Sequence, residues 1–227
     1  MATAPELEKL IRPLTLPING QFPRPWSTDL NDPSSAKVFL IGRNWGVPFL
    51  MQDVGSHNRF IDAMFNRNGE SCKRLYDKIT NHVPTRTKRV YSRLQEVFAA
   101  REIDKIIETN VICYGTRGNA KVLNQQEHRG GRERGISIFR AVLEAIRPPV
   151  LICHGTAAAS DFAKILGCNV SGPQREFHEP VPFRLPVAGY RPAVFIIPAL
   201  AAPEYNKWCR WSERYFQSLA NAVRAEL

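Results

Sequence analysis

Residues 37–46 read Lys-Val-Phe-Leu-Ile-Gly-Arg-Asn-Trp-Gly, an apolar run that stops at a turn bounded by glycines. A short apolar run of this kind, followed by glycine, predicts a buried strand. Segments with apolar residues at helical spacing, such as Val90, Leu94 and Val97, separate it from three similar runs. Strands that alternate with helices predict a three-layer α/β/α fold with a central parallel sheet. The three further runs are residues 109–114, 150–153 and 194–197.

The chain is expected to form one domain with an N-terminal segment packed on it. Its 227 residues, 44% of them hydrophobic, suffice for one core. Residues 1–36 hold a short helical patch at 5–11 and then a proline-rich stretch, which predicts extended chain across the surface. Residues 37–227 would form the α/β domain itself.

Local signals predict where several helices begin and end. Thr156 is the expected N-cap of a helix that stops at Gly167. The last helix is expected to run from Glu204 to the C-terminus, with its aromatic side chains in the core. The charged, glycine-rich run at residues 128–135 is expected to be a loop.

The composition bounds the partners and the compartment. Lysine and arginine number 31 against 21 acidic residues, a formal charge of +10 that favours a polyanion such as nucleic acid. The alternative is a basic surface with no ligand. The five cysteines form no C-x-x-C pair, so free thiols are expected rather than a metal site or disulfides. Without a run of roughly 18 apolar residues or a signal peptide, we expect no membrane contact and a cytoplasmic, that is intracellular, location.

The residues that follow the predicted strands carry the candidate site. In an open parallel sheet, ligands bind beyond the carboxyl ends of the strands. The first strand leads into Gly42-Arg43-Asn44-Trp45-Gly46, whose glycines let backbone approach a ligand closely. The second run reads Thr-Asn-Val-Ile-Cys-Tyr-Gly from residue 109, and the third ends Cys-His-Gly-Thr at residues 153–156.

Taken together, these stretches resemble the uracil-DNA glycosylase superfamily over residues 37–208, in the order that the superfamily uses. The first turn is similar to the G-x-N-P-G motif of the mismatch-specific and single-strand-selective branches, with Trp45 at the usual proline. The Asn-Arg-Phe at residues 58–60 is similar to the N-R-F that follows this motif in the mismatch-specific branch. Further similarity is to the iron–sulfur branch at residues 109–119 and 147–167, and to the single-strand-selective branch at residues 203–208.

The resemblance implies a four-stranded parallel sheet in the order 2-1-3-4 and a role for several side chains. Asn44 would hold the attacking water through its amide; the alternative is a turn asparagine bonded to its own backbone. Asn110 would read the O4 and N3–H edge of a flipped uracil; the alternative is a buried asparagine that ties strand ends together. An aromatic ring should stack on the base, with Phe49 the first choice and Trp45 the second. The other base-binding candidates are Gly42 and Arg43.

The sequence departs from the superfamily at the end of the fourth strand. Relatives place a histidine there that donates to uracil O2, and this chain has Ile197. His154 is the candidate replacement; the alternative is a core histidine bonded to backbone. Leu200 stands where relatives carry a wedge that enters the duplex, and Asn206 and Lys207 are expected to contact DNA. The cluster cysteines of the iron–sulfur branch are missing, so we expect no cofactor and no metal.

The resulting hypothesis is a monofunctional DNA glycosylase of base excision repair. It would excise uracil, mainly from double-stranded DNA, by base flipping and water attack, and the resemblance implies a monomer. One alternative is a non-catalytic member that binds DNA or abasic sites, because Ile197 cannot donate a hydrogen bond. Another is an unrelated enzyme for a small nucleotide or phosphate ester, although the chain has no G-x-G-x-x-G or Walker-type loop.

Overall fold

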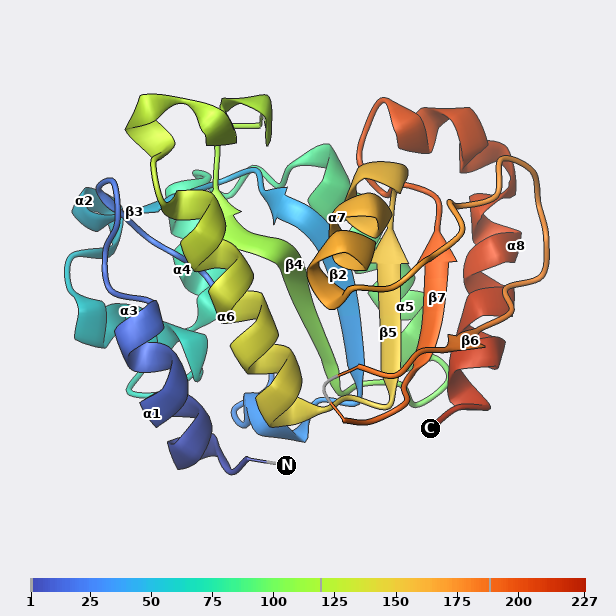
Figure 1. Cartoon of the computed structure of the whole chain (residues 1–227), viewed down its shortest axis with the longest axis horizontal. Coiled ribbons are helices and arrows are strands. Elements are labelled where there is room, and N and C mark those ends of the chain that lie inside the picture. The colour runs from blue at the N-terminus through green and yellow to red at the C-terminus, as the bar shows by residue number, and fades with distance from the viewer. Residues whose placement is uncertain (1, 119, 188) are drawn as a thin grey trace.

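The computed structural model describes residues 2–118, 120–187 and 189–227. Within these residues the main sheet has five strands in the order β4-β2-β5-β7-β6. Four of them run parallel, and β6 pairs antiparallel with β7 at the edge (Figure 1). The strands are β2 (Val38–Trp45), β4 (Ile106–Gly115), β5 (Val150–His154), β6 (Phe183–Arg184) and β7 (Ala193–Ile197).

The α/β class and the mostly parallel sheet are as predicted, but a sheet of four strands alone is wrong. The chain between β5 and β7 returns along β7, where Phe183 pairs with Val194, and adds the antiparallel edge strand. A strand of two residues is too short to show a period of two, so the sequence carries no signal for it.

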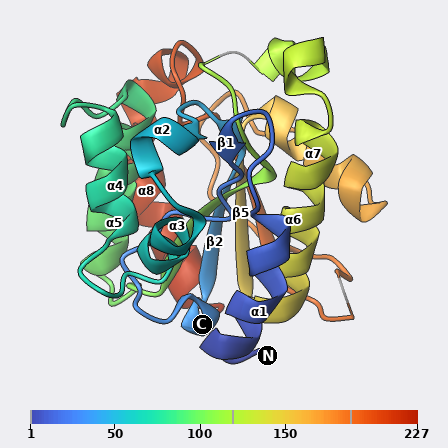
Figure 2. The same cartoon turned by 90° about the vertical axis from the view of Figure 1, so that its left-hand side faces the viewer.

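Helices cover both faces of the sheet, and Figure 2 shows the sheet edge-on between them. One face carries α1 (Ala4–Leu14), α6 (Gly131–Ile146) and α7 (Thr156–Leu166), and the other carries α5 (Arg86–Ala99) and α8 (Glu204–Arg224). The shorter elements are α2 (Met51–Val54), α3 (His57–Met64), α4 (Cys72–Ile79), the 3-10 helices η1 (Pro33–Ser35), η2 (Ala120–Asn124) and η3 (Gln126–His128), and a two-stranded sheet of β1 (Gln21–Phe22) and β3 (Phe49–Leu50).

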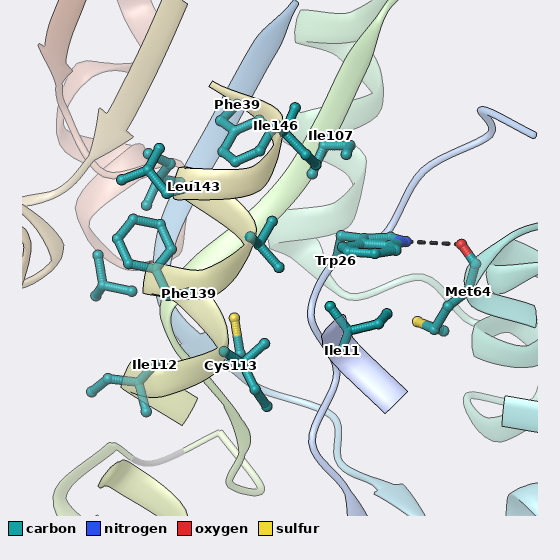
Figure 3. Packing of buried hydrophobic residues seen from close by; sticks show 14 of the residues in the cluster. Ile11, Trp26, Phe39, Met64, Ile107, Ile112, Cys113, Phe139, Leu143 and Ile146 are labelled. Carbon is teal, nitrogen blue, oxygen red and sulfur yellow. Dashed lines mark hydrogen bonds between the residues drawn. The ribbon is translucent and has the colours of Figure 1, made fainter. Parts of the chain in front are cut away.

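Alternate residues of β2, β5 and β7 enter two separate cores. In β2, Phe39 and Ile41 pack in the core below α6 and α7, whereas Val38 and Leu40 pack in the core below α5 and α8. Figure 3 shows the first of these cores, where Phe139 and Leu143 of α6 lie against the sheet. Strands buried on both faces therefore read as continuous apolar runs, which is why the sequence reveals them.

The N-terminal segment closes the open edge of β4. Ser27 and Glu108 exchange two backbone hydrogen bonds of 2.8 and 2.9 Å. Thr109 Oγ1 donates to the carbonyl of Pro25 (2.7 Å), and Trp26 Nε1 donates to the carbonyl of Met64 (2.8 Å; Figure 3). Covering an edge strand in this way satisfies its backbone groups and blocks pairing with another chain.

Two local predictions need correction. The expected loop at residues 128–135 ends early, because α6 begins at Gly131. A Cβ at Gly131 would lie 2.6 Å from the ring of Tyr114, and one at Gly135 would lie 2.8 Å from the amide nitrogen of Cys113. These glycines therefore let α6 approach β4 closely. The helix α7 begins one residue before the expected position, with Gly155 rather than Thr156 at the N-cap, and it ends as predicted at Gly167.

Candidate functional site

A cleft of about 1200 Å³ opens at the carboxyl ends of the parallel strands. Its lining comes from the last residues of β2, from β4, from the start of α7 and from the loop that joins β7 to α8. This is the position at which open α/β sheets bind ligands. The predicted turn at residues 42–46 is wrong, because β2 continues through it to Trp45. Seven of the predicted site residues line it: Gly42, Arg43, Asn44, Trp45, Asn110, His154 and Lys207.

The inner wall of the cleft is a row of residues across the sheet. Gly42 of β2 is in register with Asn110 of β4, and His154 of β5 is in register with Ile197 of β7. A Cβ at Gly42 would clash with Asn110 Oδ1, and it would lie 3.0 Å from His154 Nε2 and 3.3 Å from the Tyr91 hydroxyl oxygen. The missing side chain at Gly42 therefore leaves a small space that three polar groups surround.

His154 is buried, and both of its ring nitrogens have partners. The backbone N–H of Leu200 donates to His154 Nδ1 at 3.3 Å, and His154 Nε2 contacts the Tyr91 hydroxyl. Burial lowers the pKa of His154 to about 4, so the ring is neutral at pH 7. Because Nδ1 accepts, the single proton of the neutral ring lies on Nε2 and is donated to the Tyr91 oxygen.

Tyr91 places a hydroxyl group on the cleft that the sequence did not predict. It reaches the cleft from α5, and with His154 donating to its oxygen, its own O–H proton is free to point into the cleft. Burial, with a further contribution from Glu108, raises the pKa of Tyr91 well above its ordinary value, so it stays protonated. The spacing of Tyr91, Leu94 and Phe98 would have revealed that Tyr91 faces the sheet.

Asn110 presents an unused amide to the cleft. Its side chain makes no hydrogen bond to any residue in the described part of the chain, although the residue is only 5% exposed. Neither amide atom of Asn110 is among the buried atoms that lack a partner, so the amide reaches the cleft and is open to a ligand. This observation speaks against the alternative in which Asn110 ties strand ends together.

Asn44 is held by the donor side of its amide. Its Nδ2 donates to Thr116 Oγ1 (2.7 Å) and to the carbonyl of Trp45 (3.2 Å). The carbonyl oxygen of the Asn44 side chain is left to accept a hydrogen bond from the cleft. This geometry suits a group that orients water without taking its proton.

Of the two candidate stacking rings, only Trp45 lines the cleft. Phe49 is buried within the core and packs edge-on against Phe60 at 6.4 Å between ring centroids. Trp45 Nε1 donates to the carbonyl of Arg24 (2.6 Å), which holds the indole in place. Arg43 also reaches the cleft, but its guanidinium is paired with Asp161 at 2.8 Å.

Of the three predicted DNA contacts, Leu200 is buried, whereas Asn206 and Lys207 are exposed. Leu200 is 0% exposed and packs in the core below α8, so its expected role as a wedge is wrong for this conformation. Its backbone follows β7 directly and turns the side chain inward, where its N–H meets His154. Asn206 and Lys207 are exposed in the first turn of α8, and Lys207 Nζ pairs with Glu204 (2.8 Å).

The part of the chain that the structure describes holds neither a metal-binding cluster nor a membrane-spanning helix. Among the described residues, no group of three or more His, Cys, Asp or Glu side chains is placed to hold a metal ion. No helix in the same residues is long and apolar enough to cross a membrane. Burial raises the pKa of the Cys113 thiol to about 12, so this thiol stays protonated.

Comparison with known proteins adds no relative to this picture. No protein-family model matches the chain, and no curated protein sequence matches it significantly. The chemistry of the cleft is therefore interpreted from its own residues.

Proposed function

We propose that the chain is a DNA glycosylase of the uracil-DNA glycosylase type, which excises uracil from double-stranded DNA after flipping the base into the cleft. The observation that carries the proposal is the meeting of Asn110, Tyr91 and His154 around the space at Gly42. The order β4-β2-β5-β7 of the four parallel strands and the formal charge of +10 also support it.

The base would be read by the free amide of Asn110. One amide offers a donor and an acceptor side by side, which match O4 and N3–H of uracil. Cytosine presents the reverse pattern at these two positions and leaves both amide groups without a partner in the amide orientation that binds uracil. An unpaired buried polar group costs about 1–3 kcal/mol, which is the source of the selection.

The leaving base would be stabilised by Tyr91. Cleavage of the C1′–N1 bond leaves negative charge on the base, centred in part on O2, and a fixed O–H donor stabilises that charge in the transition state. His154 donates to the Tyr91 oxygen and thereby orients the hydroxyl. This pair offers a donor in the cleft although Ile197 cannot supply one.

Water would attack C1′ from the side of Asn44. The free carbonyl oxygen of Asn44 accepts a hydrogen bond from one O–H of the water and so orients a lone pair of the water towards C1′. The C1′–O bond forms as the C1′–N1 bond breaks, and the proton that the water loses neutralises the released base. An abasic site and free uracil are the products.

Release of uracil tests this proposal. We expect free uracil from duplexes with U·G or U·A pairs, and none from undamaged duplexes. Asn110→Asp should gain cytosine release, because a carboxylate has no N–H to donate to uracil O4 and accepts from the cytosine amino group. An unchanged preference in Asn110→Asp would remove Asn110 from base reading.

A non-catalytic member that binds abasic sites is the second candidate. The buried Ile197 beside His154 favours it, because it replaces the side chain that donates to O2 in the relatives. Tight binding to an abasic duplex together with no uracil release would decide for this candidate.

A further inference from the structure

Arg24 is a buried cation on the wall of the cleft. It lines the cleft and is 3% exposed. Its Nε and Nη1 atoms are buried without a hydrogen-bond partner in the described part of the chain. No carboxylate among the described residues forms an ion pair with it either. Burial lowers the pKa of Arg24, which reflects the cost of keeping the charge there.

Aromatic rings hold the Arg24 guanidinium in position. Its central carbon lies 3.7 Å from the ring centroid of Trp45, 4.3 Å from that of Phe49 and 5.7 Å from that of Tyr76. Such stacking stabilises the cation over the ring faces and leaves the N–H edge for hydrogen bonds in the guanidinium plane. The group is therefore oriented but not neutralised.

The Glu108 carboxylate also lines the cleft, but it is already paired. Glu108 Oε1 accepts from Lys88 Nζ at 2.6 Å and from Gln95 Nε2 at 2.9 Å. Glu108 is thus paired with Lys88 and acts on Arg24 only through space, so Arg24 has no direct ion-pair partner among the described residues. A buried charge of this kind is normally paired, and an oxyanion of a ligand would pair it.

We propose that Arg24 is an anion-binding residue of the cleft and holds a phosphate-type oxyanion of the ligand. With a nucleotide in the cleft, the oxyanion is one of its phosphates; free phosphate has the same chemistry. The inference goes beyond the proposed function, because anion binding does not require that the glycosidic bond is cleaved.

Titration calorimetry on the full chain compares deoxyuridine, deoxyuridine monophosphate and inorganic phosphate. We expect the monophosphate to bind about ten- to a hundredfold more tightly than deoxyuridine, as for one charge-assisted contact. Inorganic phosphate alone should bind and compete with the monophosphate. Equal affinities of the wild-type protein for deoxyuridine and its monophosphate, with no binding of inorganic phosphate, would overturn the proposal. Binding of inorganic phosphate without a gain for the monophosphate would support the anion site and assign it to free phosphate.

Arg24→Met removes the charge and keeps an unbranched apolar stem over the rings. If the charge is retained for a ligand, this variant should be at least as thermally stable as the wild type without ligand, and phosphate should no longer raise its melting temperature. Arg175→Met, which removes an exposed arginine from the rim of the same cleft, is the matched control and should keep the phosphate effect. Equal stabilisation of the wild type and Arg24→Met by phosphate would contradict the proposal.

The failure of this inference and the failure of the proposed function give different results. Uracil release without any effect of phosphate would remove the role of Arg24 alone. Phosphate binding that depends on Arg24, without uracil release, would leave the anion site and remove the glycosylase.

Discussion

The two faces of the central sheet are packed alike near the start of the strands and differ at their carboxyl ends. Towards α6 and α7, the apolar core continues to the end through Ile41, Val111 and Cys153. Towards α5 and α8, the residues that follow the apolar core in β2, β4 and β5 are Gly42, Asn110 and His154, and all three line the cleft. The first face stabilises the fold through apolar burial. The second face has polar groups at the cleft, where apolar side chains would stabilise the fold more.

Gly42→Ala should have the largest effect, because it removes the space in the polar row. The new methyl group would clash with Asn110 Oδ1 and crowd His154 and Tyr91. A shift of about 1 Å in these three side chains is expected to lower the single-turnover cleavage rate by about 10³-fold, because they act together on one base.

Gly46→Ala is the control for this substitution. Gly46 follows the end of β2, four residues after Gly42, and a Cβ there would meet nothing within 4 Å. We expect near wild-type cleavage from Gly46→Ala. Similar activity of the two variants would show that the space at Gly42 does not matter.

Leu143→Ala tests the apolar face. Leu143 of α6 is buried against the sheet (Figure 3), and its truncation should cost about 2–5 kcal/mol of unfolding free energy in chemical denaturation. The cleavage rate per folded molecule should not change, because no cleft residue is touched. A loss of rate in fully folded Leu143→Ala would contradict the separation of the two faces.

Tyr91→Phe removes one donor from the polar face and should lower the single-turnover rate by about 10²-fold. Substrate binding should change little, since the hydroxyl acts on charge that develops only in the transition state. Tyr215→Phe is a matched control, because Tyr215 is also buried in the core below α8 and does not line the cleft. Equal rates for Tyr91→Phe and the wild type would exclude Tyr91 as the donor.

The pH dependence of stability should give the smallest effect. The unfolded chain protonates His154 near pH 6.5, whereas the folded protein does so only near pH 4. Between these values the unfolded state binds more protons, so the unfolding free energy falls by about 1.4 kcal/mol per pH unit as the pH drops. His154→Gln should remove this part of the slope, measured as the difference between the two proteins in denaturant melts at pH 6 and pH 5. Identical slopes would show that His154 is already protonated in the fold.

The apolar face was readable from the sequence, and the polar face only in part. Strands buried on both sides appear as continuous apolar runs, and Asn44, Asn110 and His154 become candidates through the resemblance of their motifs to those of uracil-DNA glycosylases. Tyr91 and Arg24 come from a helix and from the N-terminal segment, far along the chain from the strands. Local patterns do not show which distant side chains reach a cleft.

Two errors have the same kind of cause. The position of Leu200 in its motif predicts an exposed side chain, but the chain after β7 directs it into the core. The glycines at residues 131 and 135 suggested a loop, although they serve the close approach of α6 to β4. In both cases tertiary packing decides the outcome.

The most direct test of the account is single-turnover cleavage of a labelled duplex with one U·G pair, followed by alkali to reveal abasic sites. Wild type, Asn44→Ala and the exposed control Asn169→Ala are compared. The account predicts cleavage by the wild type and by Asn169→Ala, and its loss in Asn44→Ala, because the water is no longer oriented. No cleavage by the wild type, or full cleavage by Asn44→Ala, would contradict it.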